Sequence, residues 1–206
     1  MHEAVWTREE ATAVLDDPDR YSSEDPTELW SRAGLAPGMR VVEVGSGTGF
    51  YAFPASERVG PAGRVYAVDV SPGLVDLIRE RARRRRRSNL EAVVSRPQRI
   101  PLPNDLADRV LLANVLHGIP PETVREAVRV LRPGGRLVDV DWKKEPTPRG
   151  PPVPHRLSAA AARRALERYG LRTVDEWEHG PYHYAVMLEK DGTGPRPRTP
   201  RRASPR

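Results

Sequence analysis

Short runs of apolar and β-branched residues recur along the chain from residue 40 onward, and longer segments separate them. The runs lie at 41–44, 65–70, 90–94, 109–113 and 137–140. Runs of this length, bounded by glycine or proline, are typical of strands, and the intervening segments are long enough for helices. Strands that alternate with helices predict βαβ units, and hence a parallel sheet with helices on both faces.

The segments between the runs carry signals for helices. Ser71 and Pro72 supply a capping side chain and a proline at the first helical position. Leu74, Ile78 and Ala82 then recur at four-residue spacing, which predicts one buried helix face. Further helices are expected from about residue 50, from the prolines at 120–121 to the Pro-Gly-Gly at 133–135, and over about 158–169.

Two more apolar runs, at 171–177 and 182–189, bring the predicted sheet to seven strands. We therefore expect an α/β fold with a doubly wound, mostly parallel seven-stranded sheet whose last strand is antiparallel. Residues 1–37 are predicted to form a helical lid segment and residues 38–190 the main domain. Residues 191–206 have no apolar side chains to bury and are predicted to be a disordered basic tail.

Composition narrows the class of protein. A length of 206 residues suits one domain, and the chain has no cysteine. Disulfides, cysteine-ligated metal sites and thiol nucleophiles are therefore not expected. The first ten residues lack the pattern of a secretory signal, and no apolar run approaches the ~20 residues that span a bilayer. We expect a cytoplasmic protein without a membrane span.

Charge is concentrated in two places. The chain has a net charge of +6, with 31 Arg but only 3 Lys, and much of the excess lies in the run 83–87 and in the tail. A uniformly basic protein would suggest a nucleic-acid partner, but the remainder of this chain is close to neutral. The arginine run ends a predicted helix, where a solvated face is the simplest interpretation and an acidic partner the alternative.

The first predicted strand runs into a glycine-rich turn, Glu43-Val-Gly-Ser-Gly-Thr-Gly49. Glycines at such a turn let the backbone approach a ligand closely, and the following helix N-terminus supplies free N–H donors. Asp69 ends the next strand, 20 residues after Gly49. An acid at that point accepts hydrogen bonds from ribose hydroxyls. The pair predicts a ligand with an unphosphorylated ribose.

The pattern E-x-G-x-G-x-G differs from the dinucleotide fingerprint, which would place glycine where the chain has Phe50. It resembles motif I of the class I S-adenosylmethionine (SAM) dependent methyltransferases. The segments 35–41, 100–103 and 130–137 are also similar to that family, and Asp69 matches its acid after motif I. The resemblance is nearest to the small ubiquinone/menaquinone-biosynthesis type, the type 11-like methyltransferases. It implies a Rossmann-like methyltransferase fold with SAM as the cofactor.

The resemblance also implies roles for individual residues. Glu43 would hold the ammonium end of the methionine moiety, and Asp69 the ribose hydroxyls. Asn114 would place its backbone near the methionine. The other residues implied to contact SAM are Gly45, Ser46, Gly47 and Gly49, Val70 against the adenine, and Pro97 and Gln98. Arg96 stands where the family usually has an acid that contacts the adenine amino group; because arginine cannot accept that hydrogen bond, Gln98 or a backbone carbonyl is the substitute.

Candidates for the acceptor side follow the fourth and fifth strands, where open α/β sheets bind ligands. His117 and Lys143 are the candidate catalytic residues, and Trp142, Tyr182 and Tyr184 the candidate substrate pocket. We expect Tyr182 and Tyr184 to share one face of the last strand. A solvated loop for His117 and Lys143, and core packing for the tyrosines, are the alternatives. Arg20 and Tyr21 are candidates for a lid over the cofactor.

No metal site is expected. His179 and His183 have a spacing that suits a helix, but Gly180 and Pro181 between them exclude one. The predicted function is SAM-dependent methyl transfer to a small-molecule acceptor. A non-catalytic SAM-binding or S-adenosylhomocysteine-binding sensor, or an RNA-modifying methyltransferase that docks through the arginine clusters, are the alternatives. Without cysteine, covalent cytosine-C5 and thiolate-dependent arsenic methylation are not expected, whereas O-, N- and C-acceptors remain open, as does the oligomeric state.

Overall fold

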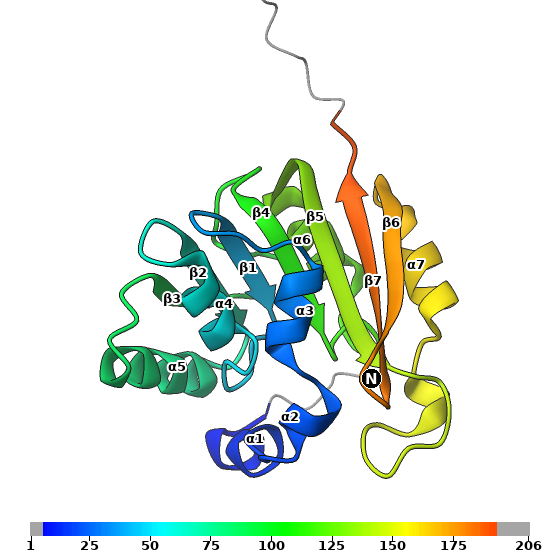
Figure 1. Ribbon diagram of the computed structural model, residues 1–206, viewed down its shortest axis with the longest axis horizontal. Coiled ribbons are helices and arrows are strands. Elements are labelled where there is room, and N and C mark those ends of the chain that lie inside the picture. Colours follow the sequence, from blue (N-terminus) through cyan, green and yellow to red (C-terminus); the bar gives the residue numbers. More distant parts are fainter. Residues whose placement is uncertain (1–5, 193–206) are drawn as a thin grey trace, which may run out of the picture.

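A seven-stranded sheet forms the centre of the protein (Figure 1). The computed structural model describes residues 6–192. The strand order is β3-β2-β1-β4-β5-β7-β6, and β7 runs antiparallel to both of its neighbours. The strands are β1 (Arg40–Val44), β2 (Arg64–Asp69), β3 (Leu90–Val94), β4 (Ala107–Ala113), β5 (Leu131–Trp142), β6 (Leu171–His179) and β7 (His183–Lys190). The predicted doubly wound, mostly parallel sheet is confirmed.

Helices cover both faces of this sheet, and two buried clusters of apolar side chains lie beneath them. Helices α3, α4 and α5 cover one face, and α6 and α7 cover the other. The helices are α1 (Arg8–Leu15), α2 (Arg20–Ser23), α3 (Pro26–Arg32), α4 (Ala52–Val59), α5 (Pro72–Arg84), α6 (Pro121–Val130) and α7 (Ala159–Glu167), with a short 3-10 turn at Val153–His155. Strand order reverses between β1 and β4, and such a switch point opens a ligand crevice at the carboxyl ends of the strands.

The N-terminal helices lie at that same end of the sheet. Figure 1 shows α1 and α2 below the arrowhead of β1. Ala11 and Leu15 of α1 pack against Leu74 and Leu77 of α5, which attaches the segment to the main domain. Trp30 of α3 is fully buried. Residues 1–5 of the predicted lid segment and 193–206 of the predicted tail lie outside the described residues.

Most strands begin or end one or more residues away from the predicted runs, and two of these differences change neighbouring segments. Strand β5 begins at Leu131, directly after α6, so the Pro-Gly-Gly segment belongs to the strand rather than to a separating turn. A shift of register against β4 between Ala107 and Arg109 accommodates it. Strand β7 begins at His183, because Gly180, at φ 65°, turns the chain after β6. Tyr182 therefore lies in the turn, one residue before the strand that was predicted to begin with it, and its sharing a face with Tyr184 stays a prediction.

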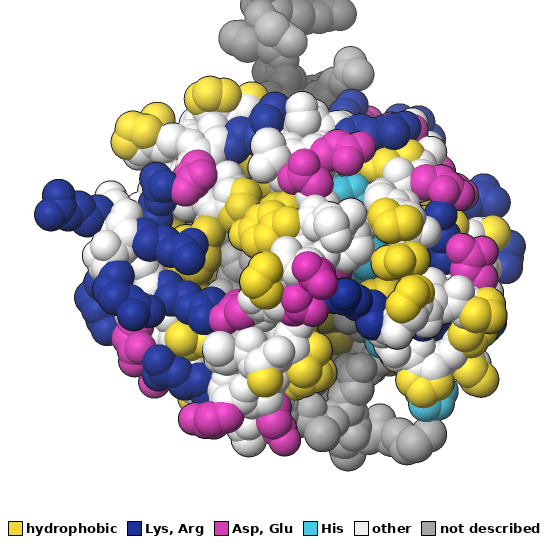
Figure 2. Space-filling view, turned by 60° about the horizontal axis from the view of Figure 1, so that its bottom comes forward, with side chains coloured by type: hydrophobic (Ala, Val, Ile, Leu, Met, Phe, Trp, Pro, Cys, Tyr) yellow, Lys and Arg dark blue, Asp and Glu magenta, His cyan; other side chains and the backbone are white. Residues whose placement is uncertain are grey.

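Arginine side chains gather over α5, on the left of the molecule in Figure 2. The run 83–87 ends this helix, and Arg64 and Arg79 line the same surface hollow. Arg64 pairs with Glu91 and Arg79 with Asp76, so acidic side chains partly balance the patch. The hollow lies around the C-terminal end of α5 and is not lined by the glycine-rich turn, which contacts this helix through Arg81 and the Thr48 carbonyl. Over residues 6–192, no helix is long and apolar enough to cross a membrane.

Candidate active site

The glycine-rich turn after β1 has a conformation that side chains would obstruct. Gly45, Gly47 and Gly49 all have positive φ, between 53° and 89°. A Cβ atom on Gly45 would lie 2.6 Å from Val115, and one on Gly49 would lie 2.8 Å from Phe53. The backbone N–H groups of Gly45 and Ser46 both donate to the carbonyl of Val68, which ties the turn to β2. These contacts explain why the sequence alternates glycine here.

Asp69 organises the turn from the end of β2. One carboxylate oxygen accepts from the N–H of Gly47 and the other from the N–H of Ser71, each at 2.9 Å. Burial raises the pKa of Asp69, and these backbone hydrogen bonds oppose the rise. Each oxygen keeps acceptor capacity for a further donor. Val70 and Val94 beside it are 41% and 39% exposed, so an apolar surface lies next to the acid.

Buried polar atoms without partners mark the crevice between β1 and β4. Glu43 Oε2, Ser46 Oγ, Thr48 Oγ1 and Asn114 Oδ1 have no hydrogen-bond partner within the described part of the chain. Asn114 follows β4 with a φ of 57°, and its N–H donates to the carbonyl of Val140. Buried polar groups are almost always hydrogen-bonded in native proteins. Their convergence from two strand ends therefore fits a polar ligand.

Glu43 is the most strongly perturbed of these groups. Burial raises the pKa of Glu43 to about 8, with the charge of Arg20 lowering it and that of Asp69 raising it. A buried carboxyl with an unpartnered oxygen favours its neutral form. An ammonium group placed against it would reverse this balance, because a neighbouring cation stabilises the carboxylate.

Replacing Glu43 with glutamine is expected to change how stability depends on pH. Because the pKa of Glu43 is raised to about 8 in the folded protein, its contribution to stability is fully present below the ordinary value near 4.5 and is lost as pH rises through 8. Glutamine cannot ionise. The free energy of unfolding of Glu43→Gln, taken relative to that of the wild type, should therefore increase by a few kcal/mol from pH 5 to pH 9. Each tenfold change in an ionisation equilibrium corresponds to about 1.4 kcal/mol. Urea unfolding at pH 5, 7 and 9 measures this; a constant difference would contradict it.

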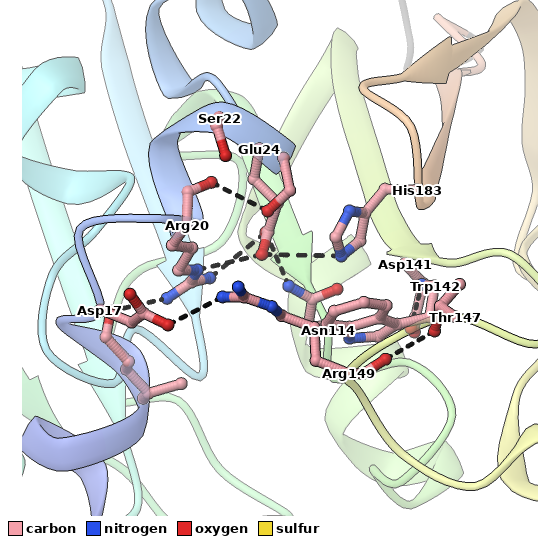
Figure 3. A network of polar contacts seen from close by, with 12 residues as sticks. Asp17, Arg20, Ser22, Glu24, Asn114, Asp141, Trp142, Thr147, Arg149 and His183 are labelled. Atoms are coloured by element: carbon pink, nitrogen blue, oxygen red, sulfur yellow. Dashed lines mark hydrogen bonds and ion pairs between the residues drawn. The ribbon is translucent and has the colours of Figure 1, made fainter.

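A network centred on Glu24 closes the crevice from the N-terminal side (Figure 3). Glu24 accepts hydrogen bonds from Arg20 at 3.0 Å, from the Tyr51 hydroxyl at 2.9 Å and from Asn114 Nδ2 at 2.8 Å. His183 Nε2 of β7 lies 3.5 Å from the same carboxylate. Burial raises the pKa of Glu24, but the charge of Arg20 and the hydrogen bonds from Arg20 and Tyr51 outweigh it, so that the pKa is lowered.

The two predicted lid residues differ in their surroundings. The Arg20 guanidinium lies 4.0 Å from the centre of the Phe50 ring and is buried against it. Tyr21 stays 57% exposed, with its ring centre 4.7 Å from that of Phe50. Sequence reasoning did not find Glu24 or Tyr51, because their partners lie far away along the chain and no motif marks them.

A second polar cluster lies on the opposite face, at the carboxyl end of β5. His117 Nδ1 lies 2.9 Å and 3.1 Å from the two carboxylate oxygens of Asp141. Asp141 is fully buried and accepts the N–H of Trp142 at 2.7 Å. Asp139 lies two residues earlier on the same face, and burial together with the charge of Asp141 raises its pKa well above the ordinary value. Sequence reasoning named His117 but not its carboxylate partner.

The structure does not bring the three predicted pocket residues together. Trp142 pairs with His183 across β5 and β7, and Asp141 pairs with Tyr184. Successive residues of a strand point to opposite faces, so Trp142 and Tyr184 lie on different sides of the sheet. Tyr182 lies in the turn before β7 and is half-buried. Lys143 is held by Glu178 of β6 at 2.5 Å.

The segment around Arg96 forms a tight exposed turn. Arg96 and Arg99 exchange backbone hydrogen bonds, and Pro97 and Gln98 lie exposed at its tip. The Pro97 carbonyl accepts from the Thr123 hydroxyl at 2.6 Å, which ties the turn to α6. The expected contacts of Pro97 and Gln98 with adenine stay predictions.

Metal ligands do not gather in the described residues 6–192, where no group of three or more His, Cys, Asp or Glu side chains is placed to hold an ion. His179 and His183 are cross-strand partners and are both fully buried. Burial lowers the pKa of His183 to about 4, partly opposed by Glu24. This histidine is therefore neutral at physiological pH.

Comparison with known proteins agrees with this site. A methyltransferase domain model matches residues 42–139. An arsenite methyltransferase of Halobacterium salinarum is 35% identical over 112 residues, which cover 53% of this chain and 28% of the relative. A ubiquinone/menaquinone biosynthesis C-methyltransferase of Pseudomonas putida is 34% identical over 126 residues, covering 56% and 48%. The chain thus spans about half or less of the length of these curated relatives.

A solved structure matches over nearly its whole length. The crystal structure of a SAM-dependent methyltransferase from Aquifex aeolicus is 33% identical and has a TM-score of 0.84. The match covers 89% of this chain and 98% of that one. With the strand order, the glycine turn and the acid at the end of β2, these similarities show that the chain belongs to the class I SAM-dependent methyltransferases.

Proposed function

We propose that this protein transfers the methyl group of SAM to a small-molecule acceptor. The observation that carries the proposal is the set of buried, unpartnered polar atoms of Glu43, Ser46, Thr48 and Asn114, which surround a turn of three positive-φ glycines. Amino-acid and nucleoside groups would satisfy these atoms, whereas a purely apolar ligand would leave them unpaired.

The residues fit the parts of SAM in order along the crevice. Glu43 would accept from the ammonium group, and the side chain of Asn114 would face the methionine moiety. Asp69 would accept from the ribose hydroxyls, and the exposed Val70 would contact the adenine. Gly45, Ser46, Gly47 and Gly49 would provide the close backbone approach. When bound, SAM supplies an electrophilic methyl group.

Three observations support a small acceptor. The curated relatives are named for small-molecule acceptors, arsenite and ubiquinone/menaquinone precursors. Helices α1 and α2 lie at the carboxyl end of β1, where they would narrow the entrance for an acceptor (Figure 1). The arginine patch surrounds the C-terminal end of α5, away from the glycine turn. The patch therefore does not line the place where a methyl acceptor would meet the cofactor.

His117 is the better-placed of the two catalytic candidates, because it follows β4 directly and is held by a buried acid. Lys143 is engaged with Glu178. Trp142, Tyr182 and Tyr184 remain candidate pocket residues, and Tyr184 lies on the face that carries His117 and Asp141. The acceptor would then lie over the carboxyl ends of β4 and β5.

Two experiments test the proposal. Calorimetry measures binding of SAM and of S-adenosylhomocysteine. An assay of S-adenosylhomocysteine formation then measures turnover across a panel of alcohols, phenols, amines and activated carbon acids. We expect binding of both nucleosides and turnover with at least one acceptor class. Failure to bind either would overturn the proposal. Binding without turnover on any acceptor would favour a sensor. Turnover only on RNA, lost when the arginines at 83–87 are neutralised, would favour the RNA-modifying alternative.

A further inference from the structure

We propose that His117 and Asp141 act together as a general base, and that the methyl acceptor is therefore a hydroxyl-bearing small molecule. This inference rests on the proposed function. His117 would take the hydroxyl proton and is the catalytic residue, while Asp141 is a positioning residue that acts through it.

Geometry fixes the orientation of the imidazole. Both carboxylate oxygens of Asp141 lie within 3.1 Å of Nδ1, so the carboxylate holds the ring from one side. In the proposed arrangement the carboxylate accepts from Nδ1–H, and Nε2 is the basic nitrogen that receives the proton. The N–H of Trp142 donates to Asp141 and restrains the carboxylate in turn. A base oriented by a third group is the general arrangement for activating a weak nucleophile.

Burial gives this pair its electrostatic character. Asp141 is fully buried and the side chain of His117 is 9% exposed, so solvent screens their interaction weakly. Asp139 lies beside Asp141, and its pKa is raised well above the ordinary value by burial and by the charge of Asp141. Tyr184 of β7 lies against the same acids, and burial raises its pKa too. Burial thus favours the neutral form of both neighbours, and Asp141 is the acid in direct contact with the His117 imidazole.

The position of the pair matches that of the acceptor. His117 lies three residues after Asn114, and Asn114 lies at the cofactor crevice. Asp141 lies at the end of the adjacent strand β5, and Figure 3 shows it near the Glu24 network and Asn114. The carboxyl ends of these strands lie next to the topological switch point, where ligands bind in open α/β sheets.

The chemistry of the pair selects the acceptor class. An oxygen that forms a bond to the methyl carbon of SAM leaves the electron pair of the broken carbon–sulfur bond on sulfur. A hydroxyl acceptor must lose one proton in this exchange, and the proton passes to Nε2 of His117. A neutral hydroxyl is a weak nucleophile at its ordinary pKa, so it depends on such a base. An unprotonated amine attacks without one, so the pair points to an acceptor that must lose a proton, and a hydroxyl is that acceptor in our proposal.

His117→Gln and Asp141→Asn test the inference. With a hydroxyl acceptor, we expect kcat to fall about 10²–10⁴-fold in His117→Gln and by a smaller factor in Asp141→Asn. Affinity for S-adenosylhomocysteine should change less than about twofold, because neither residue lies among those proposed to bind it. His155→Gln, at an exposed position of the 3-10 turn, is the matched control and should keep wild-type kcat.

Two further readouts separate catalysis from support of the fold. In the rate–pH profile, the ascending limb should move to lower pH in Asp141→Asn, because the imidazolium loses its counter-charge, and disappear in His117→Gln. In NMR titrations of the histidine side chains, the signal that is missing from His117→Gln belongs to His117. That signal should titrate at lower pH in Asp141→Asn than in the wild type. The titration needs no acceptor.

The outcomes distinguish this inference from the proposed function. Wild-type protein that binds neither SAM nor S-adenosylhomocysteine would overturn the proposed function. Two outcomes would overturn the general-base inference and leave the proposed function intact. One is wild-type protein that binds both nucleosides but methylates only amines. The other is a His117→Gln variant that keeps full kcat on a hydroxyl acceptor. A histidine titration unaffected by Asp141→Asn would contradict the role of Asp141.

Discussion

Replacing Glu24 with alanine is expected to destabilise the folded protein by about 3–5 kcal/mol, the range for a buried ion pair that loses one partner. The side chains of Arg20 and Glu24 are 13% and 3% exposed, so the guanidinium would be left buried without its counter-charge. The Tyr51 hydroxyl and the amide of Asn114 would lose their acceptor at the same time. Urea unfolding at pH 7 gives the free energy of unfolding directly.

Two controls sharpen this prediction. Glu28→Ala removes an exposed acid of α3 and should change stability by less than about 0.5 kcal/mol. A double variant, Arg20→Met with Glu24→Gln, removes both charges and should be more stable than Glu24→Ala, because no unpaired charge stays buried. A loss below about 1 kcal/mol in Glu24→Ala, or a double variant less stable than the single one, would mean that the network carries little of the fold's stability.

A dependence of stability on pH also follows from the lowered pKa of Glu24. A carboxyl whose folded-state pKa lies below its unfolded value stabilises the protein above the unfolded value, and this contribution is lost as pH falls through the folded value. Glu43 behaves in the opposite way, since burial raises its pKa to about 8. Two buried glutamates of one crevice thus differ because one has partners in the protein and the other has an unpartnered oxygen.

Sequence patterns predicted the parts of the site that are local in the chain. The glycine turn and Asp69 each follow a strand directly, so their placement at the carboxyl edge depends only on the alternation of strands and helices. The parallel strands follow from the same alternation, whereas β7 is antiparallel because only a short turn, and no helix, separates it from β6. A turn that must adopt positive φ leaves a visible trace, because it strongly favours glycine.

The missed residues depend on contacts between distant segments. Glu24 meets Asn114 across 90 positions, and His117 meets Asp141 across 24 and a whole helix. No periodicity records which of several acids faces a given histidine. The expected position of Tyr182 in the last strand differs for a related reason, because the turn at Gly180 delays the start of that strand by one residue.

Replacing Asp69 with alanine is expected to weaken SAM binding at least thirtyfold, about 2 kcal/mol or more. Hydrogen bonds to a charged acceptor contribute roughly 1.5–3 kcal/mol each, and the ribose hydroxyls would lose theirs. The variant also leaves the N–H groups of Gly47 and Ser71 without their carboxylate, so the glycine turn loses its anchor to the end of β2. Calorimetric titration with SAM and with S-adenosylhomocysteine measures the loss.

Separating these two causes requires a second variant and a second ligand. Asp69→Asn keeps one oxygen that can accept from Gly47 or Ser71, so it should retain more affinity than alanine. The 2′-deoxyribose analogue of S-adenosylhomocysteine should bind the wild type more weakly than the parent compound, whereas Asp69→Ala should bind both alike. Asp76→Ala, which removes an exposed acid from α5, is the control and should bind SAM like the wild type. If Asp69→Ala still preferred the parent compound by the wild-type factor, the carboxylate would organise the turn without contacting the ribose.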